Sequence, residues 1–394
     1  MDNKKHGKFS WKRTNVDIKN HVFVPDLDLN MESPDEFVED FMSEISKIPM
    51  DLTKPLWVFY ILNVKTSKAN STVIFKIHHS MGDGVSLISL LMECAKKTSE
   101  SNLPTIFSTK KRKFNAPNNG MVIKRLFMNV WKTFLIIFNT LVDLLWILAT
   151  IMFLKDTKTP IKGERGIEFS AKRFVHRIID FDDIKLVKTA MNVTVNDVAT
   201  GVAEAGLTRY LNMKYGQLSK NNAGYIEKAN LLPRNLRLRS IVCFNLRASP
   251  IIEDLGEIME EEKELKGKWG NIIGIALVPL TVDVQDDPLT YVRRAKATMD
   301  QKKLSLEPKC ISMAHMLLTK LFGIEPTGML INAIFLNTTL FLSNMVGPRE
   351  EITPFGHPLS YIAPTISGFP QVSEKQFVSS FFSLRTLGTG ILIY

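Results

Sequence analysis

Apolar residues follow two different spacings along the chain, and the two spacings alternate. The runs LWVFYILNV (56–64) and TVIFKIHH (72–79) predict two strands joined by the polar loop KTSKANS. The next run, VSLISLLMECAKK (85–97), has its apolar residues at helical spacing. Further on, helical stretches alternate with strand-like runs such as LRSIVCFNLR (238–247) and NIIGIALVPL (271–280). This alternation predicts an α/β protein.

The last run, FVSSFFSLRTLGTGILIY (377–394), has strand character and no turn or polar tail after it. An unfinished strand at the edge of a sheet is an exposed template for pairing, which proteins normally cover. The sequence therefore predicts an open sheet edge here and suggests a fragment of a longer protein.

The most hydrophobic part of the chain lies between residues 121 and 154. Its 21 residues from Phe134 to Leu154 are enough to cross a bilayer. Polar residues nevertheless recur along one helical face: Arg125, Asn129, Lys132, Asn139, Asp143 and Thr150. Such a stripe is typical of a helix that lies in the membrane plane or packs on the protein, and Asp143 would be costly inside a span. The pattern favours in-plane membrane association, with a true span and a buried core helix as alternatives.

Charge and cysteine content narrow the choice of partners. Lysine and arginine exceed aspartate and glutamate by 50 − 40 = 10 among 394 residues, which suits anionic partners such as phosphorylated cofactors or acidic lipid surfaces. The one compact basic run, Lys110 to Lys113, has no nucleic-acid-binding motif around it. Cys94, Cys243 and Cys310 are too widely spaced for a zinc site or a disulfide framework, so a reduced, cytosol-facing chain is expected.

The doubled histidine at residues 78 and 79 stands at the predicted corner between a strand and a helix. Neighbouring strand residues point to opposite faces, so the two imidazoles cannot bind one metal ion, and no metal site is predicted. Structural packing remains an alternative. The combination of two imidazoles, a glycine-flanked carboxylate at Asp83 and a turn favours proton transfer instead. One histidine would act as a general base while its neighbour braces the strand.

The other residues of the corner have structural tasks in this interpretation. Asp83 is expected to anchor the loop by pairing with a distant cation, and Gly84 to let the chain turn tightly into the helix. The sequence has neither a GxSxG motif nor a convincing catalytic cysteine, so direct base-assisted attack fits better than a covalent enzyme intermediate.

The motif HHxxxDG at residues 78–84 resembles the active-site motif of the CoA-dependent acyltransferase superfamily. Further segments resemble, in the same order, elements of the wax ester synthase/diacylglycerol acyltransferase family, and most closely its plant-type bifunctional enzymes. These segments are KPLW (54–57), VNDV (195–198), FNLR (244–247), WGN (269–271) and SNMVGP (343–348). The similarity covers nearly the whole chain.

The resemblance implies that a long-chain alcohol or a diacylglycerol attacks an acyl-CoA thioester, which gives a wax ester or a triacylglycerol plus CoA. His79 would take the hydroxyl proton as general base, and His78 would support the strand. Asp83 would be structural, with Arg247 as its expected partner. Acyl-CoA is then a co-substrate, and no bound cofactor is expected.

Other residues of the matching segments have two interpretations each. Asn271, Ser343 and Asn344 are candidates for the oxyanion donor, although polar residues at strand ends also cap the backbone. Pro55, Leu56 and Trp57 either line the acyl channel or pack in the core. Asn196 and Asp197 either support the site or cap the helix that follows them.

The resemblance also implies a fold of two similar α/β halves, as in chloramphenicol acetyltransferase, with mixed sheets and a central channel. The expected division is an N-terminal half at 1–120, a membrane-associating segment at 121–160 and a C-terminal half at 161–394, with elements missing at both ends. The expected location is the cytosolic face of the endoplasmic reticulum membrane, with the plasma membrane as an alternative. Self-association is left open.

Two competing functions remain at this stage. A catalytically silent, truncated paralogue could keep the lipid-binding or partner-binding surface, and the missing ends favour it. An acyltransferase for a soluble alcohol or amine fits the apolar segment poorly. The intact HHxxxDG motif favours the membrane-associated O-acyltransferase.

Overall fold

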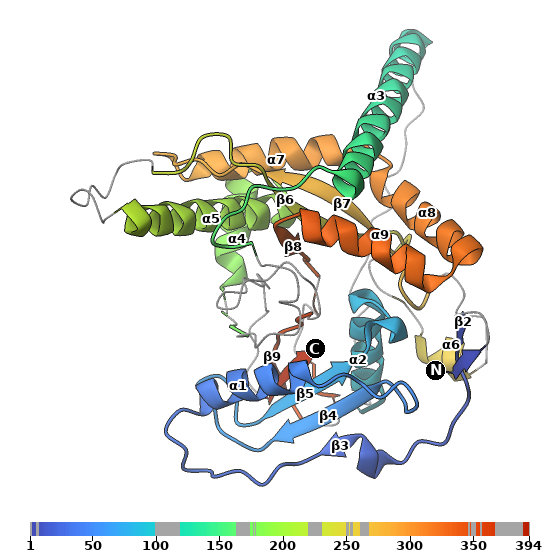
Figure 1. Cartoon of the computed structure of the whole chain (residues 1–394), viewed down its shortest axis with the longest axis vertical. Coiled ribbons are helices and arrows are strands. Elements are labelled where there is room, and N and C mark those ends of the chain that lie inside the picture. The colour runs from blue at the N-terminus through green and yellow to red at the C-terminus, as the bar shows by residue number, and fades with distance from the viewer. Residues whose placement is uncertain are drawn as a thin grey trace.

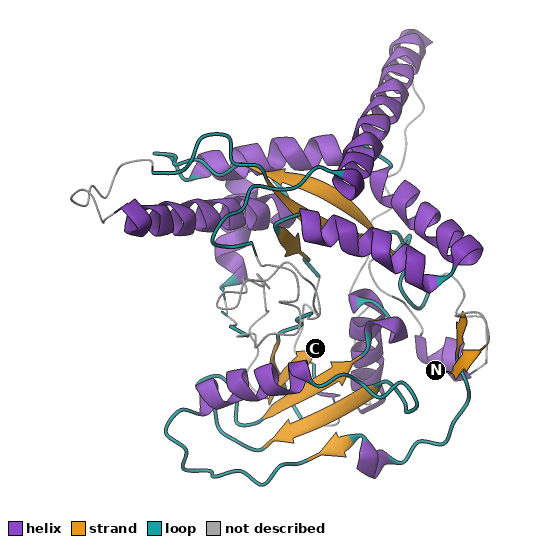
Figure 2. Cartoon of the chain, in the orientation of Figure 1, coloured by secondary structure: helices purple, strands orange, loops and turns teal. Residues whose placement is uncertain are grey.

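Two separate sheets, each covered by helices, organise the computed structural model of the chain (Figures 1 and 2). The sequence expectations for 110–113 and 377–388 lie outside the described residues. The structure describes residues 2–4, 8–98, 119–162, 174–175, 177, 179–219, 231–249, 252, 255–260, 268–345, 347, 352–354, 357–366 and 389–393.

The first sheet has five strands in the order β3-β4-β5-β10-β9. The predicted hairpin is confirmed, because β4 and β5 pair antiparallel with Trp57 opposite Ile77. The strand bounds are β3 (Val22–Phe23), β4 (Trp57–Leu62), β5 (Thr72–Ile77), β9 (Leu359–Ile362) and β10 (Thr389–Ile393). A separate short hairpin joins β1 (Asp2–Lys4) and β2 (Lys8–Ser10).

The C-terminal strand corrects the expectation of an open edge. β10 pairs in parallel with β5 on one side and with β9 on the other, so it lies inside the sheet. Parallel pairing between segments this far apart in sequence leaves no local signal, which is why the alternation pattern did not predict it. The boundaries at 120 and 160 stay a prediction, but the first sheet does not follow them, because two strands from beyond residue 161 complete it.

Two helices cover the first sheet on opposite faces. On one face, α1 (Pro34–Lys47) packs Val38, Met42 and Ile45 against Ile74. On the other face, α2 (Gly84–Thr98) packs against Phe75 and Ile77 of β5. The helix α1 was not predicted, although a Ser-Pro start with two acidic residues in its first turn is a typical helix beginning.

The second sheet has three strands in the order β7-β6-β8, with β6 and β7 antiparallel and β8 parallel to β6. Helices α5 and α7 pack on one face, and helices α8 and α9 with the base of α3 pack on the other. The strands are β6 (Leu238–Asn245), β7 (Ile273–Leu280) and β8 (Leu340–Leu342). The helices are α4 (Phe181–Met191), α5 (Val195–Ser219), α6 (Leu255–Glu260), α7 (Leu289–Lys303), α8 (Glu307–Phe322) and α9 (Ile324–Asn337).

The apolar segment forms the long helix α3 (Asn119–Met152), which projects from the body of the molecule (Figure 1). Its polar stripe faces the protein at the base of the helix. Asn139 donates to the Leu304 carbonyl at 3.2 Å, and Asp143 pairs with Lys302 at 2.7 Å. The opposite face leaves large apolar side chains exposed. By length and composition, its stretch Leu126–Met152 could cross a membrane.

Candidate active site

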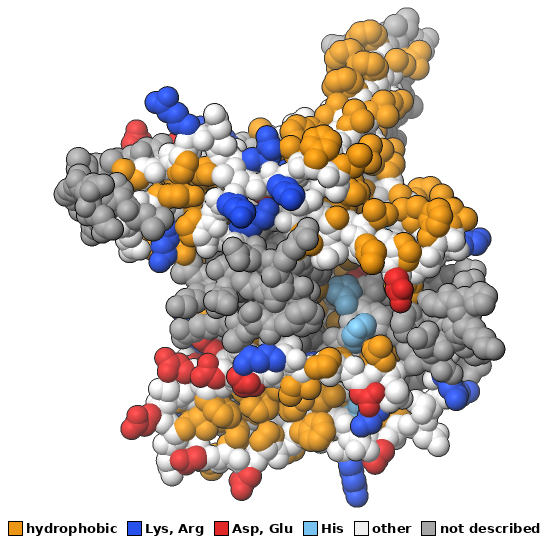
Figure 3. Space-filling view, viewed as in Figure 1, with side chains coloured by type: hydrophobic (Ala, Val, Ile, Leu, Met, Phe, Trp, Pro, Cys, Tyr) orange, Lys and Arg blue, Asp and Glu red, His pale blue; other side chains and the backbone are white. Residues whose placement is uncertain are grey.

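The HHxxxDG motif occupies the corner between β5 and α2, as the sequence predicts. Strand β5 ends at Ile77, a single turn of 3₁₀ helix η2 (His79–Met81) follows, and α2 begins at Gly84. The main-chain N–H of His78 donates to the Leu56 carbonyl at 3.0 Å, which extends the β4–β5 ladder by one bond. Histidine side chains are exposed in a recess between the two halves of the molecule (Figure 3).

The two histidines of the motif have different environments although both are exposed. The Nδ1 atom of His78 accepts the main-chain N–H of Ser80 at 3.2 Å and lies 2.7 Å from the Ser80 hydroxyl. An N–H group can only donate, so Nδ1 of His78 carries no proton and Nε2 carries it. Partial burial, followed by repulsion from His79, lowers the pKa of His78. The described residues form no hydrogen bond to the ring of His79, which leaves its nitrogens free for a substrate.

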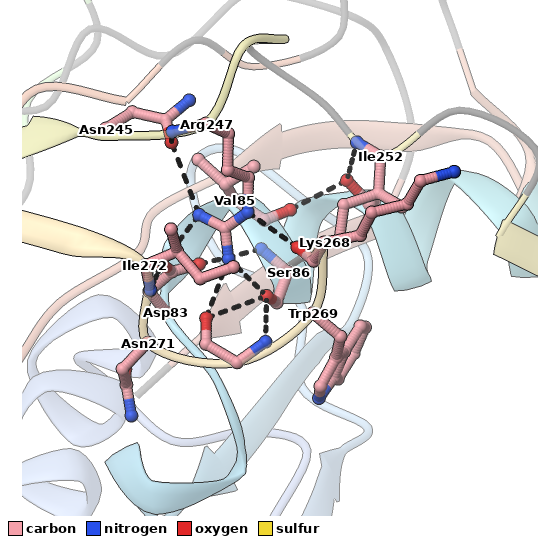
Figure 4. A network of polar contacts seen from close by, with 12 residues as sticks. Asp83, Val85, Ser86, Asn245, Arg247, Ile252, Lys268, Trp269, Asn271 and Ile272 are labelled. Atoms are coloured by element: carbon pink, nitrogen blue, oxygen red, sulfur yellow. Dashed lines mark hydrogen bonds and ion pairs between the residues drawn. The ribbon is translucent and has the colours of Figure 1, made fainter. Parts of the chain in front are cut away.

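Asp83 is the buried centre of the corner and is 2% exposed. One carboxylate oxygen accepts the Ser86 N–H at 3.0 Å and so caps α2. The other accepts the Ile272 N–H at 3.0 Å and lies 2.7 Å from Nη1 of Arg247. The expected pair between Asp83 and Arg247 is therefore present, and it joins the two halves of the chain (Figure 4).

Arg247 uses the rest of its guanidinium to hold the neighbouring loop (Figure 4). Its Nη2 donates to the Gly270 carbonyl at 2.7 Å and to the Ser86 hydroxyl at 3.0 Å, while Nε donates to the Lys268 carbonyl at 2.6 Å. Charge-assisted bonds of this kind are about twice as strong as neutral ones. The loop 268–270 thus has a fixed position against the start of α2.

The same loop of the second half holds the turn that carries His79. The Asn271 side chain donates to the main-chain carbonyl of His79 at 2.8 Å. The Trp269 indole N–H donates to the Met81 carbonyl at 2.9 Å. The orientation of the His79 turn therefore depends on contacts from a part of the chain about 190 residues away in sequence.

The segment after β8 lies against the beginning of α2. A Cβ atom on Gly84 would stand 1.8 Å from the Met345 sulfur, so a larger residue here would have to displace the flexible Met345 side chain. Ser343 and Asn344 directly precede Met345, and the Asn344 side chain donates to the Asn196 side chain. The candidate residues of two separate motifs are thus in contact.

Comparisons with known proteins point to one family. The wax ester synthase/diacylglycerol acyltransferase catalytic domain matches residues 3–199, and the C-terminal domain of the same family matches residues 269–382. The chain is 47% identical to wax ester synthase/diacylglycerol acyltransferase 11 of Arabidopsis thaliana, over 93% of this chain and 74% of that one. It is 44% identical to the Arabidopsis enzyme numbered 3, over 95% of this chain and 75% of that one.

The chain belongs to the wax ester synthase/diacylglycerol acyltransferase family. It spans about three quarters of the length of these plant relatives. Among solved structures, it is similar to the wax ester synthase/diacylglycerol acyltransferase from Marinobacter aquaeolei VT8, with a TM-score of 0.43 and 18% identity over 88% of this chain and 66% of that one. It is also similar to the first condensation domain of the CDA synthetase, with a TM-score of 0.37 and 11% identity, over 84% of this chain and 59% of that one. The predicted α/β class with mixed sheets in two halves is confirmed.

Other residues of the family segments have structural contacts. Leu56 is fully buried and is a core residue here. Trp57 is half-buried and its ring lies 4.5 Å from that of His21, with the two planes tilted by 31°. Its main-chain carbonyl accepts a hydrogen bond from the His21 ring. Pro55, which precedes them, is half-buried. Lining of an acyl channel by Pro55 and Trp57 stays a prediction.

Asn196 and Asp197 have different contacts, so the two interpretations given for them apply to different residues. Asp197 accepts the Thr194 N–H at 2.7 Å, and the Thr194 hydroxyl accepts the Asp197 N–H at 3.2 Å. This reciprocal arrangement is a capping box at the start of α5. Asn196 instead contacts Asn344. Asp197 is therefore a helix cap, while a role of Asn196 in the site stays a prediction.

Three further residues of the site were not predicted from the sequence. Ser86 connects Arg247 with the Gly270 N–H and was not singled out, although its spacing from Asp83 is typical of a capped helix start. Trp269 was noted only as part of a motif. Met345 gave no signal, because its contact with Gly84 arises from packing alone.

Proposed function

We propose that this chain is an acyl-CoA-dependent O-acyltransferase in which His79 is the general base. The proposal rests on the difference between the His78 and His79 rings at the β5–α2 corner. His78 is engaged by its own turn, whereas the His79 ring is exposed and has no hydrogen-bond partner among the described residues, and its main chain is held by Asn271. A base in such a site has a free lone pair in a fixed place.

In the proposed reaction, a ring nitrogen of His79 takes the proton from the hydroxyl of the acceptor. The hydroxyl oxygen attacks the thioester carbonyl of acyl-CoA and forms a tetrahedral oxyanion. The oxyanion then collapses, the carbon–sulfur bond breaks, and the imidazolium of His79 gives its proton to the departing CoA thiolate. The ester and free CoA leave, and His79 returns to its neutral form.

The oxyanion needs a preorganised donor, and the three candidates from the sequence stay proposals. Asn271 and Asn344 each use one N–H in a contact with the protein. A side-chain amide has two N–H groups, so each asparagine keeps one that could reach the oxyanion. Ser343, directly before Asn344, is half-buried and has a hydroxyl of its own. Asn271 is the strongest candidate, because it already contacts the turn of His79.

The proposed substrates are acyl-CoA and either a long-chain alcohol or a diacylglycerol. Apolar acceptors of this kind dissolve in membranes, and the exposed apolar face of α3 fits a protein that works at a membrane surface. The anchored polar stripe favours a helix that lies in the membrane plane. We propose the cytosolic face of the endoplasmic reticulum as its location.

Product analysis tests the proposal. Membranes from a lipid-null host that expresses the chain receive labelled acyl-CoA with either hexadecanol or diacylglycerol, and the products are identified by mass spectrometry. Loss of a general base lowers turnover by about 10²–10⁴-fold, so we expect His79→Ala to abolish the labelled ester. The acceptor that yields the ester names the substrate.

The neighbouring histidine provides the matched control. In His78→Asn the amide oxygen can still accept the Ser80 N–H and cap the turn, so we expect turnover to fall less than tenfold. Equal losses in both variants would contradict the assignment of the base to His79. No ester from well-folded protein, with either acceptor, would favour the silent lipid-binding paralogue.

A further inference from the structure

Helices α8 and α9 form a hairpin whose tip is apolar and exposed. The tip includes the last turns of α8, the connection at Gly323 and the first turns of α9. Between residues 313 and 330, His315, Lys320 and Glu325 are the only titratable side chains. The large apolar side chains exposed on the tip include Met316, Leu317, Leu321, Phe322, Ile324 and Met329. Soluble surfaces rarely expose so many neighbouring apolar side chains without a partner.

The hairpin and α3 are packed together at their bases. The base of α3 packs through Ile147 in one cluster with Ile311 of α8 and Ile334 of α9. Figure 3 shows hydrophobic side chains along α3 and over α8 on the same side of the molecule. The exposed side chains of both elements therefore lie on one face of the molecule.

Three buried charged side chains lie behind this apolar surface, whereas His315, Lys320 and Glu325 are exposed on the tip. Asp143 and Glu307 both pair with Lys302, and these three side chains are at most 14% exposed. The Leu306 N–H donates to the Thr140 hydroxyl at 2.8 Å, which joins α3 to the start of α8. These charges thus hold the base of α3 to the hairpin, and most of the large side chains exposed on the outer face of both elements are apolar.

We propose that the α8–α9 tip and the exposed face of α3 form one surface that inserts into a lipid bilayer. A bilayer fits better than a protein partner, because the surface projects as a helix and a helical hairpin instead of forming a groove (Figure 1). Protein interfaces have a polar rim around their apolar centre. The stretch Leu126–Met152 of α3 instead has the length and composition of a helix that could cross a membrane. The proposal goes beyond acyl transfer and does not depend on it.

Two contact elements instead of one would define how the protein lies on the membrane. A single helix can rotate about its axis, whereas a helix and a hairpin that are packed together fix an orientation. The bases of α8 and α9 cover one face of the second sheet, so insertion of the tip would turn this side of the molecule toward the bilayer.

Hydroxyl-radical footprinting of the unmodified full chain tests the surface directly. Methionine oxidation is read by mass spectrometry with and without phosphatidylcholine vesicles. Met316 and Met329 report on the tip, Met152 reports on α3, and Met213 on α5 is the internal reference; their exposed fractions are 63%, 74%, 70% and 43%. Relative to Met213, we expect vesicles to lower oxidation of both tip methionines and of Met152 at least fivefold.

Other outcomes would overturn the proposal. Protection of Met152 without protection of Met316 and Met329 would mean that α3 alone binds lipid. No protection at any of the three would mean that the surface does not insert. Protection of the tip without vesicles, increasing with protein concentration, would identify a second copy of the chain as the occupant.

A pair of matched variants gives an independent measurement. Leu321→Gln with Met329→Gln alters side chains that are 63% and 74% exposed, and Leu186→Gln with Leu29→Gln alters side chains that are 70% and 73% exposed elsewhere. Vesicle flotation should give a partition coefficient at least about tenfold lower for the first pair and less than twofold lower for the second. Equal effects of the two pairs would refute insertion of the tip.

Discussion

Replacing Asp83 with asparagine removes one charge from a buried pair while it keeps the shape of the side chain. The carboxylate accepts from the Ser86 N–H with one oxygen, and from the Ile272 N–H and Arg247 with the other. An amide has a single acceptor oxygen, so at least one of these donors would face an N–H group. The Arg247 guanidinium would also lose its counter-ion, with only 4% of its side chain exposed.

Breaking a buried pair in this way costs about 3–5 kcal/mol, because an uncompensated charge stays inside the protein. We therefore expect Asp83→Asn to lower the free energy of unfolding by an amount in this range and to lower turnover through disorder at the corner. The matched control is Asp287→Asn. Asp287 pairs with Arg293 at 2.6 Å, close to the 2.7 Å of the buried pair, but their side chains are 49% and 59% exposed. Solvent screens such a pair, so stability should change little.

Urea unfolding followed by circular dichroism measures these differences, and a double-mutant cycle separates structure from chemistry. In the Arg247→Met background the guanidinium is absent, so Asp83→Asn should cost about 2 kcal/mol less than in the native chain. An Asp83→Asn protein with native stability and no turnover would refute the reasoning, because it would place Asp83 in the chemistry. Equal costs in both backgrounds would refute the pairing as the source of the effect.

Three further variants test other parts of the structure. Gly84→Ala should lower the melting temperature only slightly, because the flexible Met345 side chain, whose sulfur would lie 1.8 Å from the new Cβ, has to move; in a Met345→Ala background the substitution should have no such effect. Asn271→Ala should lower kcat more than it raises KM, because it frees the His79 turn without removing the base, and steady-state kinetics would measure this. Burial raises the pKa of Glu204 from 4.5 to about 7, so the folded state binds its proton more tightly and the free energy of unfolding falls as pH rises through this interval. Glu204→Gln should remove this fall, which amounts to at most about 3 kcal/mol, in unfolding measured from pH 4 to pH 8.

The strand-to-helix corner with the HHxxxDG motif was predictable because its signals are local. A strand that ends in two histidines, a glycine-flanked aspartate and a run of helical spacing lie within residues 72–98, and each element forms as the spacing indicates. The β4–β5 hairpin and the long helix α3 were predictable for the same reason. The different states of His78 and His79 were not, because they depend on one hydrogen bond from Ser80.

The sequence by itself determined the α/β alternation, the strand-to-helix corner and a helix with one polar stripe, because each of these is a spacing between neighbouring residues. Only the tertiary structure decided that β10 lies between β5 and β9, and that the stripe of α3 faces the protein. It also brought Arg247 to Asp83 across 164 residues. Contacts at this range depend on how whole sheets and helices pack, and no periodicity along the chain records that packing.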